Sequence, residues 1–296
     1  MKSIWLAVAM LGVGCGVSSS DIATHEDDAL GDDSAELSTT KDTFVIVRRD
    51  QRKCISPLCG GYWVKDLNST MQEKYVSGFD FSGSTLTDAV QAQVAGAPDF
   101  ELVVEGRLGK KETAYNTRPL TVIAAYRGMP GVTFAATDKF YSVLPTKIGC
   151  VTQPCASLMT TRLNRTTGHT MATDVTVTRA LALGGEEAWL YGRVLTNRAV
   201  VAGKIVRANR HVTVDASQVF VALPDDTSAC PSTTAPSCPS GKIRAYERTA
   251  DRCTVPAQCT PPGVCAPFEP SCAPGYKLIG WQNICPRHAC EPDFLE

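Results

Sequence analysis

The chain has 296 residues, of which 44% are hydrophobic, and a formal net charge of -1. This length allows two domains or one domain with appendages, and the hydrophobic content is enough for a substantial core. From residue 43 onward, 27 basic residues stand against 22 acidic ones. Because this small excess is scattered and makes no concentrated basic stripe, nucleic acid is not expected as a partner.

An export signal is predicted for residues 1–14. Lys2 precedes an apolar run over residues 4–11, which is too short to span a bilayer as a stable helix. The following Leu11-Gly12-Val13-Gly14-Cys15 resembles a bacterial lipobox, with its leucine one position further from the cysteine than usual. We expect Cys15 to be lipidated and to anchor the chain to a membrane. Signal cleavage that leaves Cys15 as a free thiol is the alternative.

Residues 15–42 are expected to form a flexible acidic tether. Segment 21–42 holds eight acidic residues and the single base Lys41, and large apolar residues are almost absent from the tether. Such a segment cannot bury enough surface to offset the entropy lost on ordering. Residue 16 is Gly, which favours the outer membrane under the enterobacterial sorting rule. The expected location is therefore the bacterial cell envelope, with the outer membrane favoured.

Residues 43–139 are predicted to form a first antiparallel β unit. Short β-rich runs, such as 44–47 and 62–64, are separated by turn residues. One helix is expected from Thr87 to Val94, and Pro98 ends it.

Residues 140–224 are predicted to repeat this unit. A C-x4-C-x7-L-N motif begins at Cys54 and again at Cys150, 96 residues later. We also match Gly106-Arg107 with Gly192-Arg193, which implies that the second copy has lost residues in two loops, one of them near the helix. The predicted fold is mainly β: two tandem copies of an antiparallel β unit, one short helix in the first copy, and a small disulfide-rich C-terminal region.

The repeated motif is interpreted as a hairpin tip closed by a local disulfide, Cys54–Cys59 in the first copy and Cys150–Cys155 in the second. By chain entropy a loop this small contributes about 2–3 kcal/mol. Asn68 and Asn164 would then end their strands at turns, because Asn tolerates a left-handed backbone. Both also begin N-glycosylation sequons, which is the less favoured interpretation.

The tail, residues 225–296, is rich in Pro, Cys, Ser and Thr and holds eight of the thirteen cysteines. Without Cys15 the remaining twelve could form six disulfides, which fits an oxidising compartment; a zinc protein is the alternative, but no two C-x2-C pairs occur. Units this small need such staples. By analogy with the hairpin tips we favour pairing of neighbouring cysteines: Cys230–Cys238, Cys253–Cys259, Cys265–Cys272 and Cys285–Cys290. The alternative is a crossed pattern, in which the first cysteine of each set of four pairs with the third and the second pairs with the fourth.

No catalytic constellation is found. The four histidines are His25, His169, His211 and His288, and the sequence contains no HExxH, GxSxG or Gly-rich phosphate loop. Adjacent Glu186 and Glu187 would face opposite ways on a strand, and the two Gly-Arg pairs favour packing over an anion site. No cysteine pair has C-x-x-C spacing. We therefore predict a non-enzyme with no cofactor and no metal.

The phrase from Cys54 to Val64, with the later Leu-Asn, resembles an uncharacterised domain of secreted cysteine-containing lipoproteins of myxobacteria. The resemblance covers about residues 43–224, and a cysteine-rich tail often accompanies this domain. It implies a compartment and an architecture and assigns no site.

Two function hypotheses follow from these features. The first is a non-enzymatic, envelope-anchored surface lipoprotein with a structural or partner-binding role, its partner being an unknown envelope protein or polysaccharide. The second is a protease-inhibitor-like or protease-resistant module carried by the tail, whose disulfide loops are short and contain prolines.

Overall fold

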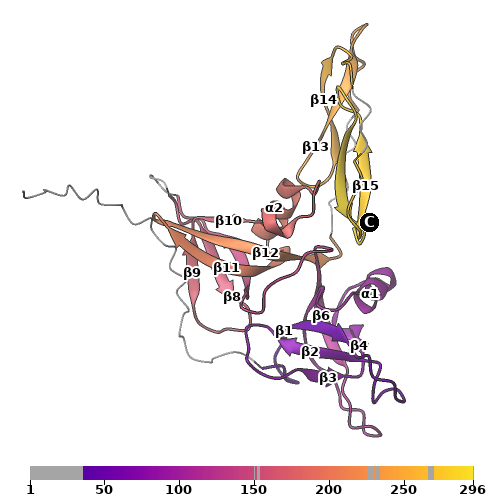
Figure 1. Cartoon of the computed structure of the whole chain (residues 1–296), viewed down its shortest axis with the longest axis vertical. Helices are drawn as coiled ribbons and strands as arrows, with labels where there is room; N and C mark the ends of the chain where they lie inside the picture. Colours follow the sequence, from indigo (N-terminus) through magenta and orange to yellow (C-terminus); the bar gives the residue numbers. More distant parts are fainter. Residues whose placement is uncertain are drawn as a thin grey trace, which may run out of the picture.

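The computed structural model describes residues 36–149, 151, 154–225, 230, 234–265 and 270–295. The predicted signal peptide, Cys15, most of the predicted tether and Cys150 lie outside these residues. The described chain is mainly β, and its C-terminal hairpins project from one end of the molecule (Figure 1). Among the described residues, no helix is long and apolar enough to cross a membrane.

The first copy is a row of five strands with one helix. Its elements are β1 Thr43–Arg49, β2 Tyr62–Asp66, β3 Lys74–Val76, β4 Phe79–Asp80, the 3-10 turn η1 Phe81–Gly83, α1 Asp88–Ala95, β5 Leu102–Leu108 and β6 Leu120–Gly128. The strand order is β3-β2-β1-β5-β6, with antiparallel neighbours throughout. The short β4 pairs in parallel with the start of β6.

The second copy repeats this row. Its elements are β7 Lys139–Pro145, β8 Leu158–Arg162, β9 His169–Ala172, β10 Asp174–Thr176, η2 Thr178–Ala180, α2 Glu187–Leu195, β11 Ala199–Ala208 and β12 His211–Leu223. The strand order is β9-β8-β7-β11-β12, and β10 pairs in parallel with β12 as β4 does with β6. The duplication predicted from the sequence therefore extends to every element.

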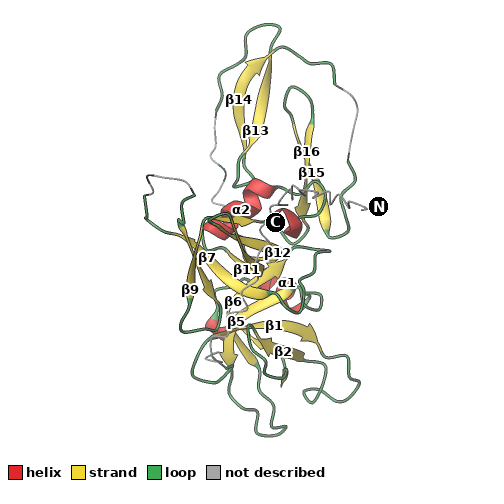
Figure 2. Cartoon of the chain, turned by 60° about the vertical axis from the view of Figure 1, so that its left-hand side comes forward, coloured by secondary structure: helices red, strands yellow, loops and turns green. Residues whose placement is uncertain are grey.

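The two copies share one twelve-stranded sheet. β6 and β12 pair antiparallel, from Phe220 opposite Gly128 to Leu223 opposite Ala125. Because each copy contributes the same strand to this junction, the sheet has an approximate two-fold symmetry about it. The copies are consequently halves of one continuous body and not two separate domains in tandem (Figure 2).

Both copies contain a helix, and the sequence-based match of the Gly-Arg pairs is wrong. α1 begins at the predicted place, with Thr87 Oγ1 accepting from the Val90 N–H. α2 was not predicted, because Glu186 makes no side-chain cap and Gly192 lies inside the helix. It forms instead because Trp189, Leu190 and Val194 become buried against the sheet.

The counterpart of Gly106 is Gly203. Each glycine follows a register shift, between Glu105 and Gly106 in β5 and between Ala202 and Gly203 in β11. A Cβ at Gly106 would lie 2.4 Å from the Thr121 carbonyl oxygen, and one at Gly203 would lie 2.2 Å from that of Asp215. Both positions need glycine because another backbone passes there. The second copy has thus kept its helix, and the expected loss of loop residues near it is wrong.

The sheet has a hydrophobic cluster on each face. The larger one lies under the helices and joins residues of both copies. The smaller one lies on the opposite face and is centred on Phe140 and Phe220, whose ring centres are 5.9 Å apart. It includes Val103 and Val200, which occupy equivalent positions in β5 and β11, so this core belongs equally to both copies.

The end of the predicted tether packs on the first copy. Leu37 is buried, and its N–H donates to both carboxylate oxygens of Asp66, at 3.1 and 3.2 Å. The Leu108 N–H donates to the Ser38 carbonyl oxygen. The predicted tether boundary at residue 42 therefore lies too far along the chain, because one large apolar residue is enough to attach this segment.

The tail forms two stapled hairpins, and neighbour pairing of its cysteines is wrong. Its strands are β13 Ile243–Arg248, β14 Thr254–Thr260, β15 Tyr276–Trp281 and β16 Arg287–Pro292. The observed disulfides follow the crossed alternative: Cys230–Cys253, Cys238–Cys259, Cys265–Cys285 and Cys272–Cys290. The predicted neighbour pairs Cys230–Cys238, Cys253–Cys259, Cys265–Cys272 and Cys285–Cys290 are not formed. The reason is that antiparallel pairing brings the two arms of a hairpin together, whereas cysteines that are neighbours in sequence lie along one arm.

A buried set of charges joins the tail to the second copy. The guanidinium groups of Arg193, Arg248 and Arg252 and the carboxylates of Asp225 and Glu291 are all nearly inaccessible to water. Arg193 Nε lies 2.6 Å from Asp225, and Arg252 lies 3.5 Å from Asp225 and 3.3 Å from Glu291. Burial lowers the pKa of Arg252. Such networks add little net stability but fix geometry, so we infer that they set the orientation of the tail.

Candidate functional site

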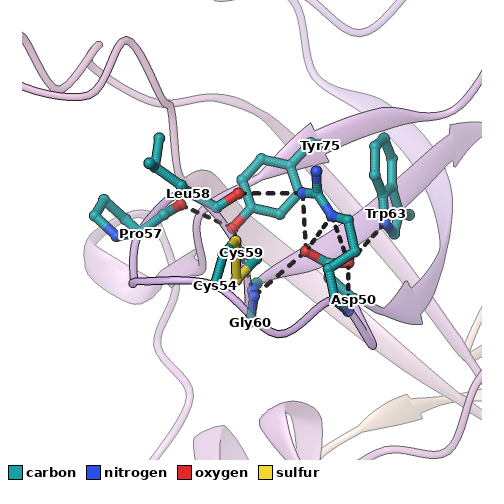
Figure 3. The surroundings of a disulfide bond; sticks show 10 residues. Asp50, Cys54, Pro57, Leu58, Cys59, Gly60, Trp63 and Tyr75 are labelled. Carbon is teal, nitrogen blue, oxygen red and sulfur yellow. Dashed lines mark hydrogen bonds and ion pairs between the residues drawn. A yellow bond between two sulfur atoms is a disulfide. The ribbon is translucent and has the colours of Figure 1, made fainter.

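The candidate site is the tip of the β1–β2 hairpin (Figure 3). The Asp50 N–H donates to the Gly61 carbonyl oxygen and closes the base of the tip. Cys54 and Cys59 form the predicted disulfide, with their Cα atoms 5.6 Å apart. The sequence therefore correctly predicts a hairpin whose turn is stapled locally.

Asp50 is the centre of the tip. Its side chain is almost fully buried and accepts from Arg52 Nε at 2.9 Å, Trp63 Nε1 at 3.2 Å and the Gly60 N–H at 3.3 Å. The hydrogen bond from the Arg52 guanidinium holds the pKa of Asp50 well below its usual range. Asp50 thus ties both arms of the loop to the strand that carries Trp63.

Arg52 and Tyr75 hold the outer part of the loop. Arg52 donates to the Leu58 carbonyl oxygen at 3.1 Å, and the Tyr75 hydroxyl donates to that of Pro57 at 2.8 Å. The Arg52 guanidinium carbon lies 5.0 Å from the ring centres of both Trp63 and Tyr75. The carbonyl groups of Pro57 and Leu58 therefore have hydrogen-bond donors within the protein, and these contacts fix the conformation of the loop.

This loop exposes two large apolar side chains, next to the exposed polar side chains of Gln51, Lys53 and Ser56. Ile55 is 77% exposed and Leu58 is 47% exposed. The Leu58 N–H donates to the Ile55 carbonyl oxygen at 3.0 Å, so the two residues are the first and last of one tight turn. A braced loop that presents two apolar side chains to water has the features of a contact surface.

The corresponding loop of the second copy has the same base contact but not the same side chains. The Thr146 N–H donates to the Ser157 carbonyl oxygen, matching Asp50 and Gly61 96 positions earlier. Cys155 is disulfide-bonded, and its predicted partner Cys150 lies outside the described residues. Counting by the same offset, Arg52, Trp63 and Tyr75 are replaced by Ile148, Met159 and Met171. The buried Asp50 carboxylate and its side-chain donors Arg52 and Trp63 therefore have no counterparts in the sequence of the second copy.

The Leu-Asn motif joins the copies. Asn68 accepts from the Phe140 N–H at 2.9 Å and donates to its carbonyl oxygen at 2.8 Å, while Asn164 does the same to Phe44, at 2.7 Å for each bond. Both asparagines have the predicted left-handed backbone, with φ near 60°. Since their amide nitrogens also donate to the Leu163 and Leu67 carbonyl oxygens, both side chains are fully engaged within the protein.

Asn68, just after β2, binds β7, and Asn164, just after β8, binds β1, whereas β1 and β7 do not pair as strands. Each side-chain amide presents one donor and one acceptor to the facing strand, as a backbone peptide would. The six strands from β1 through β6 and β12 to β7 thereby curl into a ring around the Phe140 and Phe220 core. Nothing in the sequence indicates this contact, because the side chain and its target lie 72 or 120 residues apart.

The other polar residues singled out in the sequence are not brought together. His169 and His211 are exposed first residues of β9 and β12, and His288 lies on β16. Glu186 pairs with Arg248, whereas Glu187 accepts from the Thr178 hydroxyl. Among the described residues there is no group of three or more side chains that could hold a metal ion.

A family model described as a domain of unknown function, DUF6748, matches residues 43–223. These bounds run from the first residue of β1 to the last residue of β12, and so contain both copies. The chain belongs to the DUF6748 family. The DUF6748 domain is thus the duplicated, asparagine-bridged sheet, and the stapled tail lies outside it.

An uncharacterised protein of Dictyostelium discoideum is 25% identical over 253 residues, which cover 82% of this chain and 84% of the relative. This match is longer than the DUF6748 domain itself, so the similarity continues beyond the sheet. No solved structure matches the chain.

Proposed function

We propose that this chain is an exported, non-enzymatic surface protein of the cell envelope that binds a protein partner through the Cys54–Cys59 loop. The observation that carries the proposal is the pairing of exposed Ile55 and Leu58 with an internal brace of disulfide, carboxylate and hydrogen bonds. A loop already held in one conformation loses little entropy on binding, and apolar side chains that become desolvated supply most of the binding energy.

The brace favours a protein over a lipid surface. A bilayer accepts an apolar side chain in many orientations, so it would not need Asp50, Arg52 and Tyr75 to fix the loop. A partner with a shaped apolar cleft does need a fixed loop, because complementarity is lost when the two side chains move independently. We therefore take the partner to be a protein with a cleft that accepts Ile55 and Leu58 together.

Export and anchoring are part of the proposal. Five described disulfides and the bonded Cys155 suit an oxidising compartment. The lipobox-like Leu11–Cys15 segment and the acidic residues that follow it support a lipid anchor at Cys15, with a tether that ends where Leu37 packs on the sheet. Mass spectrometry of the mature protein should find acylated Cys15, and Cys15→Ser should release the protein from membranes. An unmodified Cys15 in a membrane-free protein would overturn the anchor.

The partner test uses the full mature chain with a photo-crosslinking residue at position 55. The crosslinked protein is identified and purified, and its Kd is measured against the native chain, Ile55→Asp and Leu58→Asp. We expect each substitution to weaken binding by more than about tenfold, as for a contact-centre residue.

Leu183→Asp is the matched control, because Leu183 is 93% exposed far along the chain from this loop. It should leave Kd unchanged, and all variants should keep the same disulfides and unfolding midpoint. Equal affinity of the native chain and both loop variants would contradict the proposal. Turnover of a substrate that Ile55→Asp abolishes would replace it with a catalytic role.

The competing proposal is the inhibitor-like tail. It is tested by incubating the full chain with a panel of serine and cysteine proteases. Stoichiometric inhibition that survives Ile55→Asp and disappears when Cys272 and Cys290 are both replaced by Ser would support the tail. Absence of inhibition across the panel would remove it.

A further inference from the structure

A groove of about 660 Å³ lies on the first copy beside the loop that joins β5 to β6. Arg107 at the end of β5 lines it, together with three basic residues of the loop, Lys110, Lys111 and Arg118. The hydroxyl groups of Thr39, Ser82 and Thr121 and the carboxylate of Asp80 complete its polar lining. Four cations from the short segment 107–118 thus gather on one surface.

Few carboxylates neutralise these cations. Arg107 lies 3.2 Å from Asp42 in an exposed pair, which is a weak interaction in water. Arg118 donates to the Gly109 carbonyl oxygen at 2.9 Å, which leaves its charge uncompensated. In the part of the chain that the structure describes, no ion pair involves Lys110 or Lys111.

Asp80 lies in the groove as an acceptor. It accepts from the Ser82 N–H at 3.0 Å and from the Thr121 hydroxyl at 3.1 Å. Hydrogen bonds from the Ser82 side chain, the Ser82 N–H and the Thr121 hydroxyl lower the pKa of Asp80. Both of its oxygens are therefore held in place by η1 and β6. The groove consequently combines hydroxyl and carboxylate groups that are held in place with several cationic side chains.

The equivalent groove of the second copy lacks this excess of positive charge. It has a volume of about 260 Å³, and Lys204 takes the place of Arg107 one residue after the bulge glycine. Arg179 is bound to Asp215 at 2.8 Å, and Asp138 also lines the groove, so two cations face two carboxylates. Asp215 stands where the first copy has Thr121, since each follows the same strand pairing.

The connecting segments explain the difference. In the first copy residues 109–119 form a loop that brings Lys110, Lys111 and Arg118 to the groove. In the second copy β11 and β12 continue as paired strands to a two-residue turn at 209–210, which does not line the groove. The same fold therefore makes a self-neutralised groove in one copy and a basic one in the other.

We propose that the groove of the first copy binds an anionic polysaccharide, with Arg107, Lys110 and Lys111 contacting its charged groups. Sugar hydroxyls would donate to Asp80 and to the serine and threonine hydroxyl oxygens. Among the residues that the structure describes, no aromatic ring lines the groove, so these residues offer no platform for stacking a nucleic-acid base.

The test measures binding of the full mature chain to a size-defined, fluorescently labelled sulfated oligosaccharide at several salt concentrations. Neutral dextran, a single-stranded DNA oligonucleotide and vesicles of anionic lipid are measured alongside. We expect binding of the sulfated sugar that weakens as salt rises and no binding of dextran. Tighter binding of the DNA or of the vesicles than of the sugar would overturn the polysaccharide assignment.

Variants locate the site by comparison of the two copies. Arg107→Gln should weaken binding about fivefold, and the double change Lys110→Gln with Lys111→Gln should weaken it about twentyfold. Lys204→Gln, at the matching position of the second copy, should have no effect. Equal losses at Arg107 and Lys204 would overturn the site.

A measurement on the unmutated chain guards against misfolded variants. Acetylation of lysines with and without the sulfated sugar, followed by peptide mass spectrometry, should show protection of Lys110 and Lys111 and none of Lys204. Uniform labelling of all three lysines would count against the proposal.

Discussion

The two copies have the same order of helices and strands but differ in their side chains. The first copy displays groups outward: a braced loop with Ile55 and Leu58 and a basic groove at Arg107. In the second copy, Asp215 neutralises the equivalent groove by pairing with Arg179. Its helix α2 supplies Arg193 to the buried charges under the tail. The two copies therefore differ in the charge of their grooves and in their contacts with the tail, although they share one framework.

The asparagine bridges and the bulge glycines are common to both copies, so the two members of each pair should respond to substitution alike. The loop brace and the grooves differ, so they should not. Four sets of substitutions test this division, and they are given from the largest expected effect to the smallest.

Phe220→Ala should lower the free energy of unfolding by about 3–5 kcal/mol, because this ring is fully buried between the copies. Chemical denaturation of the full chain measures the change. Tyr126→Ala is the matched variant, since Tyr126 takes the same place in the first copy. It should cost less because its ring is only partly buried. A larger loss at Tyr126 than at Phe220 would show that the shared core is centred elsewhere.

Asn68→Ala and Asn164→Ala should each cost about 2–3 kcal/mol. Either change leaves a backbone N–H and carbonyl group of the facing strand without partners. Asn68→Gly and Asn164→Gly keep the left-handed backbone without strain, so they report the bridge alone. A loss below about 0.5 kcal/mol in both glycine variants would mean that water replaces the bridges and that they do not hold the copies together.

Gly106→Ala and Gly203→Ala should each destabilise the protein by about 1–3 kcal/mol, because the added methyl group would meet a carbonyl oxygen of the neighbouring strand. Gly192→Ala should be neutral or stabilising by up to about 1 kcal/mol, since that residue lies in α2 with open space around it. Thermal unfolding distinguishes the three. Destabilisation at Gly192 equal to that at Gly106 would restore the rejected match of the Gly-Arg pairs.

Asp50→Asn tests the brace that only the first copy has. The pKa of Asp50 lies below its ordinary value of 3.8 in the folded protein. Ionised Asp50 therefore stabilises the loop above that pH, and this contribution is lost as the pH falls from 3.8 towards the folded pKa. The variant should show a shallower decline of stability with acid over that window. Thr146→Val, at the matching position of the second copy, should keep the native acid dependence; the same slope in the native chain and Asp50→Asn would contradict this role.

The strands, the first helix and the stapled hairpin tip could be predicted because their signals are local. Short runs of β-branched and aromatic residues define β1 and β2, Thr87 caps α1, and the spacing of Cys54 and Cys59 limits them to a tight turn. The crossed pairing in the tail could not be chosen, because spacing alone does not say which arm of a hairpin a cysteine faces.

The candidate site was predicted only in part. Its disulfide could be read from the sequence, but buried Asp50 looks like any acidic loop residue until Trp63 and Gly60 are placed around it. α2 was missed for a related reason: its stability comes from burial of Trp189 against the sheet rather than from helix-forming residues. Such contacts depend on the assembled sheet and leave no trace in a short window of sequence.

The asparagine bridges have a consequence for how this chain arose. Asn68 binds Phe140 as Asn164 binds Phe44, so each half offers the other the same patch that it receives. Such isologous contacts are those of a homodimer with two-fold symmetry. We infer that the ancestor was a single unit that worked as a pair of identical chains, later fused end to end. Expressed as separate polypeptides, the halves should reassociate with one-to-one stoichiometry, and Asn68→Gly should weaken that association; halves that stay monomeric at high concentration would refute this origin.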